Sequence, residues 1–295
     1  MASAELIFDG KHCTGESPVW LAEEQALYWV DIPAKRIWYW VASSGATRSW
    51  LLPERAGCIA HITGNQWVAG MEIGVFIVTL NSDDSVNTAR LATADHASTN
   101  MRFTDGRCDR QARFPAGTMF MDMAAARHVG AVSTFAANGE NRALLDHMIV
   151  PNGMAFSPYG ATMYLSGSHP LVQLIWAFDY DTATGTPSNK RAFVEMNMLP
   201  GRPDGAAVDV DGRFWICGND AGLIHHFTPQ GKLDRSLAVP VKKPAMCAFV
   251  GENLDALFVT SIRPGGVDLE DQPLAGGVFA LRPGVRGIAE PKFAP

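Results

Sequence analysis

Short apolar segments recur along the chain at nearly regular intervals. Most begin with an aromatic or aliphatic pair, continue with small or apolar residues, and end near a turn. The six segments begin at Tyr28, Trp67, Phe114, Tyr164, Phe214 and Phe258, which gives spacings of 39, 47, 50, 50 and 44 residues. A repeat of about 40 to 50 residues that holds several short strands is typical of a β-propeller blade.

Most of these segments are followed by a second apolar segment, as expected for neighbouring strands of one blade. The second segments begin at Arg36, Gly74, Leu174, Gly222 and Gly277. After Phe114 the pattern is weaker, and residues 130–133 are the best candidate. We therefore predict an all-β chain that forms a six-bladed β-propeller, with residues 1–295 as a single domain. A pair of sandwiches is the structural alternative, but it does not explain the regular period.

The 27 residues before Tyr28 are expected to supply a strand that closes the ring onto the last blade, because a closed ring leaves few free strand edges. Composition agrees with a packed β protein. Hydrophobic residues make up 47% of the chain and charged residues 18%, which favours a buried core over disorder. The 28 glycines and 18 prolines fit a chain with many turns.

Net charge and cysteine usage narrow the class of protein. The formal net charge is -6 and no basic run occurs, so binding to nucleic acid or to an anionic membrane through charge is not expected. No signal peptide is recognisable at the N-terminus, and the uncharged stretch 148–178 is interrupted by proline and glycine. The five cysteines are widely spaced without a CxxC pair, which predicts buried, reduced thiols in a cytoplasmic protein.

Polar residues precede four of the six segments at nearly equivalent positions. Glu16 and Asn152 lie 12 residues before Tyr28 and Tyr164, Asp204 lies 10 before Phe214, and Arg102 and Thr104 lie 12 and 10 before Phe114. The strand before each segment is the innermost one of its blade, so these positions are expected to converge at one mouth of the central channel. Two carboxylates and one amide oxygen there suit a hard divalent cation.

Each of these residues also has an ordinary interpretation. Asp105-Gly106, Asn152-Gly153 and Asp204-Gly205 are common turn sequences, and Glu16 could be a solvated loop residue. The shared position in four repeats favours a convergent site, because turns need no such alignment. Without a cation, two neighbouring buried carboxylates would repel each other and one would take up a proton.

These motifs together resemble the SMP-30/gluconolactonase/luciferin-regenerating-enzyme family. The matching segments run in order from about Gly15 to Leu281 and include Gly15-Glu16-Ser17-Pro18-Val19-Trp20, Arg102-Phe103-Thr104-Asp105-Gly106, Pro151-Asn152-Gly153-Met154, Pro203-Asp204-Gly205-Ala206 and Leu257-Phe258-Val259-Thr260-Ser261. The resemblance implies a six-bladed propeller with one divalent cation on its axis: Ca²⁺, Zn²⁺, Mn²⁺, Fe²⁺ or Mg²⁺. It also implies hydrolysis of a sugar-acid lactone.

The resemblance further implies roles for individual residues. Glu16, Asn152 and Asp204 occupy the positions of the metal ligands, and Arg102 occupies that of a substrate-contacting arginine. Thr104 stands where the family commonly has Asn, and Asp122 where some members have a Glu that touches sugar hydroxyls. Both residues are expected to contact the substrate. Threonine keeps a hydroxyl but lacks the amide donors, so the hydroxyl pattern recognised is expected to differ.

The expected reaction is gluconolactonase-like hydrolysis of an aldonolactone to the aldonic acid. The cation polarises the lactone carbonyl, Asp204 accepts a proton from the attacking water, and Arg102 helps to stabilise the oxyanion. The expected partner is a small-molecule sugar lactone, and the protein is expected to be a monomer or small homo-oligomer. A non-catalytic cation-binding or protein-binding propeller, or an esterase or phosphotriesterase at the same site, is the alternative. Neither G-x-S-x-G nor a nucleotide-binding glycine motif occurs.

Overall fold

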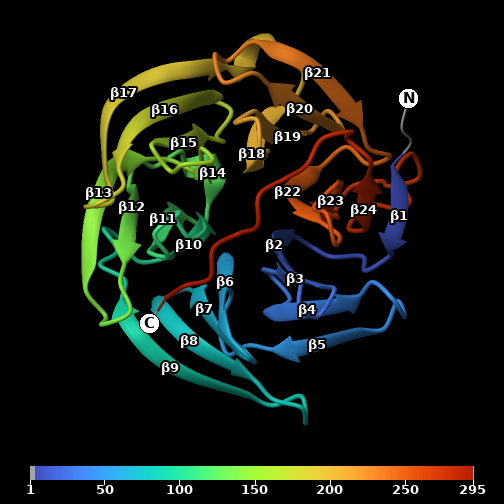
Figure 1. The fold of residues 1–295 in the computed structure, drawn as a ribbon, viewed down its shortest axis with the longest axis horizontal. Helices are drawn as coiled ribbons and strands as arrows, with labels where there is room; N and C mark the ends of the chain where they lie inside the picture. Colours follow the sequence, from blue (N-terminus) through green and yellow to red (C-terminus); the bar gives the residue numbers. More distant parts are fainter. Residues whose placement is uncertain (1–3, 295) are drawn as a thin grey trace.

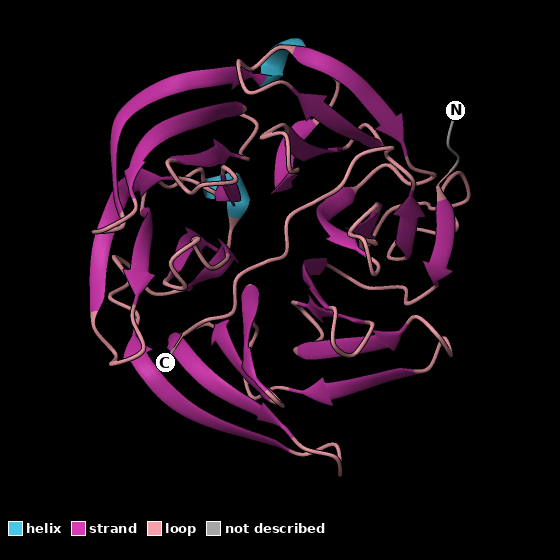
Figure 2. Ribbon diagram, in the orientation of Figure 1, coloured by secondary structure: helices cyan, strands magenta, loops and turns pink. Residues whose placement is uncertain are grey.

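Six four-stranded antiparallel sheets form a ring in the computed structural model, which describes residues 4–294 (Figure 1). Each sheet is one blade, with its first strand at the axis of the ring and its last strand at the rim. Helix in the described residues is limited to two short 3-10 turns, η1 (Met123–Ala125) and η2 (Met196–Met198) (Figure 2). The predicted six-bladed β-propeller is therefore confirmed.

The first three blades follow one another along the chain, each from axis to rim. Blade 1 consists of β2 (Gly15–Leu21), β3 (Ala26–Asp31), β4 (Arg36–Val41) and β5 (Thr47–Leu51). Blade 2 consists of β6 (Cys58–Thr63), β7 (Gln66–Gly70), β8 (Gly74–Leu80) and β9 (Val86–Thr93). Blade 3 consists of β10 (Met101–Gly106), β11 (Phe114–Phe120), β12 (Gly130–Phe135) and β13 (Asn141–Met148).

The last three blades repeat this order. Blade 4 consists of β14 (Pro151–Phe156), β15 (Thr162–Gly167), β16 (Leu174–Asp181) and β17 (Thr186–Glu195). Blade 5 consists of β18 (Arg202–Val208), β19 (Phe214–Asn219), β20 (Leu223–Phe227) and β21 (Leu233–Ala238). Blade 6 consists of β22 (Pro244–Val250), β23 (Ala256–Ser261), β24 (Val278–Leu281) and, from the start of the chain, β1 (Glu5–Phe8).

The N-terminal strand closes the ring, as predicted. β1 pairs antiparallel with β24, so that Glu5 lies opposite Ala280 and Leu6 opposite Phe279. The outer strand of the last blade thus comes from the beginning of the chain. Hydrogen bonds between the two ends of the sequence hold the first and last blades in place.

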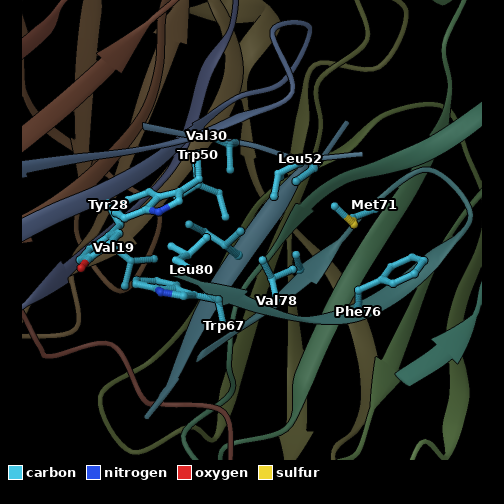
Figure 3. Packing of buried hydrophobic residues seen from close by; sticks show 14 of the residues in the cluster. Val19, Tyr28, Val30, Trp50, Leu52, Trp67, Met71, Phe76, Val78 and Leu80 are labelled. Atoms are coloured by element: carbon cyan, nitrogen blue, oxygen red, sulfur yellow. The ribbon is translucent and has the colours of Figure 1, made fainter. Parts of the chain in front are cut away.

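The recurring apolar segments are the second strands of the blades, and they are buried on both faces. In β3, β19 and β23 every residue is buried, because each sheet packs against the sheets of both neighbouring blades. Figure 3 shows the cluster between blades 1 and 2. There the rings of Tyr28 and Trp67, from β3 and β7, lie 4.5 Å apart between centroids. Burial on both faces explains why these segments are continuously apolar rather than alternating.

The innermost strands carry an irregularity near their start. In five of them the pairing with the second strand shifts at this point: between Glu16 and Val19, Phe103 and Gly106, Asn152 and Ala155, Pro203 and Ala206, and Pro244 and Cys247. Such bulges bend a strand and redirect its side chains. The alternative interpretation of Asp105-Gly106, Asn152-Gly153 and Asp204-Gly205 as turns is wrong, because all three pairs lie inside strands.

Glycine in these pairs allows neighbouring inner strands to approach closely. Gly153 has a φ of +59°, a conformation that residues with a side chain rarely adopt. A Cβ at Gly205 would lie 2.4 Å from the Cβ of Met246 in the next blade. Both positions therefore require glycine, the first for its backbone conformation and the second for the packing of β18 against β22.

The C-terminal segment 282–294 crosses the centre of the ring after β24 (Figure 1). Its backbone bonds to loops that follow the inner strands, since Gly287 N–H donates to the carbonyl of Leu254 at 2.8 Å and Val210 N–H to that of Arg286 at 3.0 Å. It therefore covers the face opposite the starts of the inner strands. We call this face the lower face and the opposite one the upper mouth.

Two side chains of this segment anchor it beneath the axis. Glu290 forms an ion pair with Arg107, which follows β10, at 3.0 Å. A cavity of about 20 Å³ remains beside Glu290, enough for about one water molecule. Phe293 is 1% exposed and packs edge-on against Phe114, and its N–H donates to the carbonyl of His61 at 2.7 Å. The segment thus closes the lower face.

None of the five cysteines forms a disulfide, and Cys58, Cys108, Cys217 and Cys247 are buried as predicted. Cys13 is exposed, so the prediction of buried thiols is wrong at this position. The residue precedes β2 in a surface loop, where its N–H, not its thiol, is used in a hydrogen bond to Asp31. No helix among residues 4–294 is long and apolar enough to cross a membrane.

Substitution of Phe293 by Ala is expected to lower the free energy of unfolding by about 3 kcal/mol, the lower end of the range for removing a buried phenyl ring. The lower end applies because the segment after β24 belongs to no blade and can detach locally. Urea denaturation measures the change. Tyr159→Ala, at a side chain that is 90% exposed, is the control and should stay within about 0.5 kcal/mol of the parent. Equal stabilities for the two variants would contradict the anchoring role.

Candidate functional site

Polar side chains from four blades meet at the upper mouth, where the inner strands begin. Thr104 of β10 donates its hydroxyl to Asn152 Oδ1 of β14 at 3.1 Å. Asn152 in turn donates from Nδ2 to Asp204 Oδ1 of β18 at 2.5 Å. Glu16 of β2 lies close enough to Asp204 and Arg102 for their charges to shift its pKa. The predicted convergence of Glu16, Asn152 and Asp204 with Thr104 is thus present in the structure.

The carboxylate of Asp204 is held on both oxygens. In addition to the bond from Asn152, its Oδ2 accepts a hydrogen bond from Nδ2 of Asn219 at 2.6 Å. Asn219 is fully buried at the end of β19, and sequence analysis missed it. Its neighbours form Gly218-Asn219-Asp220, a composition typical of turns, which hid its position in the strand. The one signal in the sequence was that Asn219 lies only five residues after Phe214, close enough to belong to the same strand.

Asp105 lies one step deeper along β10 and is 6% exposed. Its Oδ2 accepts the N–H of Met154 at 2.8 Å, whereas its Oδ1 is buried and has no hydrogen-bond partner among the described residues. Burial raises the pKa of the Asp105 carboxyl. This residue is therefore a buried carboxylate between the polar site and the Arg107–Glu290 pair, rather than a turn residue.

Burial and mutual repulsion disfavour the ionised forms of the two carboxylates in the absence of a cation. Burial, with a smaller contribution from the Asp105 charge, raises the pKa of Asp204 to about 6, although the Arg202 charge and the amide donors act in the opposite direction. Burial also raises the pKa of Glu16 well above its usual range, followed by repulsion from Asp204 and Asp105. Such shifts are typical of functional sites.

The donor set fits a divalent cation. Three carboxylates, those of Glu16, Asp105 and Asp204, lie within reach of one another's charge, and the guanidinium charges of Arg102, Arg107 and Arg202 act on them in turn. Glu16, Asn152 and Asp204 supply the oxygen ligands that hard cations prefer. Two buried polar atoms, Asp105 Oδ1 and the Oγ of Ser166, which lies opposite Asn152 on β15, have no hydrogen-bond partner among the described residues. Among residues 4–294, no group of three or more His, Cys, Asp or Glu side chains is arranged to hold a metal.

His225 and His226 lie apart from this site. His225 contacts Ser236 and the carbonyl of Pro200, and His226 contacts Asp209 and stacks on Trp215. Their rings thus have separate surroundings. Neither contacts the polar residues at the axis.

Above the polar site lies a cavity of about 480 Å³ at the upper mouth. Arg102 and Asp122, two of the three predicted substrate residues, both line it, together with Arg55 and Met121. Asp122 Oδ1 accepts the N–H of Ala124 at 3.1 Å and caps η1, which leaves its Oδ2 without a protein partner among the described residues. The third predicted residue, Thr104, is not in this lining and instead contacts Asn152.

Arg102 connects the cavity with the carboxylates. Its Nη1 donates to the carbonyl of Phe103 at 2.7 Å, and burial lowers its pKa while the charge of Glu16 raises it. The fold and the site thus define a six-bladed propeller with an oxygen-rich site on its axis and an arginine-lined cavity above it. This arrangement can hold a cation and a small polar molecule side by side.

Comparison with known proteins identifies the family. The model of the family described as SMP-30/Gluconolactonase/LRE-like region matches residues 14–263. The chain therefore belongs to this family, and the predicted resemblance is confirmed. The 6-deoxy-6-sulfogluconolactonase of Pseudomonas putida is 34% identical over 282 residues, which cover 95% of this chain and 94% of the relative. Regucalcin of Sus scrofa is 33% identical over 290 residues, which cover 96% and 95%.

A solved structure of luciferin-regenerating enzyme superimposes with a TM-score of 0.93 at 25% identity and covers all of both chains. The likeness extends over the whole ring, including the N-terminal closure and the C-terminal segment. The architecture that positions the axial site is therefore common to this chain and a family member.

Substitution of Glu16 by Gln is expected to flatten the pH dependence of stability in metal-free protein. The folded-state pKa values of Glu16 and Asp204 lie above their unfolded values. The folded chain therefore binds more protons than the unfolded chain. The stability that this proton binding contributes is lost as pH rises from about 4.5 through the raised pKa values. At about pH 8 the variant should melt at least about 2 °C above the parent, and at about pH 5 the difference should shrink.

Thermal unfolding in the presence of a chelator measures this difference. Glu252→Gln is the matched control, because Glu252 is exposed in the loop after β22, on the lower face. This control should keep the parental pH dependence. If Glu16→Gln also keeps it, repulsion between the axial carboxylates is not the origin of the pH dependence.

Proposed function

We propose that the protein is a metal-dependent lactonase that hydrolyses a sugar-acid lactone to the free acid. The observation that carries the proposal is the meeting of Glu16, Asn152 and Asp204 at the axis, directly below a cavity that Arg102 lines. The family relationship and the 34% identity to a lactonase over most of the chain support this reaction class.

Glu16, Asn152 and Asp204 would hold one divalent cation, which is Ca²⁺, Zn²⁺, Mn²⁺, Fe²⁺ or Mg²⁺. When bound, such a cation supplies Lewis-acid polarisation of an ester carbonyl. Thr104 positions one of its ligands, since its hydroxyl donates to Asn152 Oδ1. In this proposal Thr104 acts on the ligand shell rather than directly on the sugar, which differs from the expectation drawn from the sequence.

Asp204 serves as the general base for the attacking water. Its carboxylate is oriented by two amide donors, from Asn152 and Asn219, so that it cannot rotate freely within the site. Because it is 4% exposed, a water molecule that reaches it comes from the upper mouth. A positioned carboxylate that removes a proton from water contributes about 10²- to 10⁴-fold to a rate.

Arg102 and Asp122 orient the substrate. Arg102 carries N–H donors beside the carboxylates and stabilises the negative charge that develops on the carbonyl oxygen. Asp122 has a free carboxylate oxygen in the cavity lining, which can accept a hydrogen bond from a sugar hydroxyl. A lactone whose ester points to the axis and whose hydroxyls point to the mouth satisfies both residues.

The names of the relatives leave the substituents of the lactone open. The Pseudomonas putida relative is named for a gluconolactone that carries a sulfo group, and the name regucalcin specifies no lactone. A non-catalytic propeller, and an esterase or phosphotriesterase at the same site, remain the competing functions. Neither is favoured by a specific feature of the site.

The decisive experiment strips the protein of metal, adds back single divalent cations, and follows acid release from a panel of aldonolactones. The proposal predicts that hydrolysis depends on the cation and is faster for lactones than for simple aryl esters or phosphotriesters. A folded sample that hydrolyses none of the lactones with any of the five cations would refute the proposal.

Asp204→Asn is expected to lower kcat for lactone hydrolysis at least about 100-fold, because the amide cannot accept the proton. Asp211→Asn is the control, since Asp211 is exposed in the turn after β18. Circular dichroism and metal titration of both variants separate loss of the base from loss of fold or metal. Turnover within a few-fold of the parent in Asp204→Asn would exclude it as the general base.

A further inference from the structure

The cavity at the upper mouth contains an arginine that the proposed reaction does not use. Arg55 lies in the loop before β6 and lines the cavity together with Arg102 of blade 3. The lining also includes residues of blade 1, so the cavity spans the mouths of three adjacent blades. Its volume of about 480 Å³ is within the range of small-molecule sites in proteins.

The charges in the lining favour a negatively charged ligand. Its charged side chains are Arg55, Arg102 and Asp122, two cations and one anion. The protein as a whole carries a formal charge of -6, so its overall field repels anions. Glu72 and Glu16 act on the two arginines from outside the lining, so an anion in the cavity would be bound by guanidinium donors rather than by a net positive charge. A divalent cation below the cavity would strengthen the attraction.

The guanidinium of Arg55 is fixed at one end and free at the other. Its Nη1 donates to Glu72 Oε1 at 3.1 Å and approaches Met121 Sδ at 3.4 Å. Its Nε and Nη2 have no hydrogen-bond partner within residues 4–294, and the side chain is 39% exposed. A guanidinium edge with free Nε and Nη2 donors matches two oxygens of a carboxylate, sulfonate or phosphate.

Glu72 positions Arg55 rather than filling its binding edge. The N–H of Glu72 donates to Glu54 Oε2 at 3.1 Å, so the two loops that carry Arg55 and Glu72 are linked. The carboxylate of Glu72 is outside the lining of the cavity, and it accepts a hydrogen bond from only one nitrogen of the guanidinium, Nη1. The arginine is therefore held in place before any ligand binds, which lowers the entropic cost of binding.

Arg55 and Arg102 also lie close enough to repel each other. After burial, the charge of Arg55 is a further cause that lowers the pKa of the Arg102 guanidinium. An anionic group on a bound ligand would relieve this repulsion. A neutral sugar would not, because its hydroxyls carry no charge.

We propose that Arg55 is a specificity-determining residue that binds an anionic group of the substrate, so that the substrate is an aldonolactone with a carboxylate, sulfonate or phosphate remote from the ester. The inference rests on the proposed lactonase function. In this arrangement the ester lies at the axial site beside Arg102. The anionic end lies at the outer part of the cavity, against the free edge of Arg55.

The test compares one neutral lactone with its charged counterparts. The probes are D-glucono-δ-lactone and its derivatives with a sulfonate or a phosphate at the terminal carbon, and the enzyme is loaded with the most active cation. We expect the parent to have a kcat/KM at least about tenfold higher for a charged lactone. Arg55→Gln should raise KM for that lactone at least about tenfold and change kcat/KM for the neutral lactone by less than about threefold.

Arg90→Gln is the control, because Arg90 lies on the outer strand β9 over the ring of Phe76 and away from the cavity. It should match the parent with both lactones. The inference is overturned if the parent shows no preference for the charged lactones, or if Arg55→Gln affects neutral and charged lactones equally. The comparison between sulfonate and phosphate identifies which group is preferred.

A separate arm keeps this inference distinguishable from the proposed reaction. If no lactone is hydrolysed, the lactonase proposal fails, and calorimetry decides about Arg55 with gluconate and its terminally phosphorylated counterpart as probes. Tighter binding of the phosphorylated acid to the parent, lost in Arg55→Gln, supports anion recognition by Arg55. Equal binding of both acids to the two proteins overturns it.

Discussion

Repulsion between carboxylates held at the axis is the constraint on which the rest of the site depends. Glu16 and Asp204 come from blades 1 and 5, yet the ring brings them within reach of each other's charge. Folding must therefore supply energy to keep them together, through amide donors such as Asn219 and through packing of the blades. A divalent cation offsets the repulsion most effectively, since it interacts with both carboxylates at once.

The two faces of the ring differ, because one is closed at the axis and the other is open. On the lower face the C-terminal segment fills the axis, with Glu290 paired to Arg107 and Phe293 buried between blades. On the upper mouth the inner strands begin with bulges that turn their side chains toward the axis. A ligand thus approaches from one side, where it meets the charged side chains of Arg55, Arg102 and Asp122.

The repeat and the convergent residues could be predicted from the sequence because both depend on strand spacing. Asn152 and Glu16 keep a constant distance from their apolar segments, and the ring converts that distance into proximity. Asn219 could not be predicted, because its neighbours have turn composition although it ends a strand. The ion pair of Arg107 with Glu290 joins residues 183 positions apart in a segment without periodicity, so no local pattern could indicate it.

Crystals of the protein soaked with Mn²⁺ would test the central claim, a single axial cation site, most directly. Anomalous scattering locates the ion independently of any activity. The account predicts one strong peak on the ring axis, with oxygens of Glu16, Asn152 and Asp204 at about 2.0–2.6 Å. A peak away from these three residues, or none in a well-ordered crystal at saturating Mn²⁺, would contradict it.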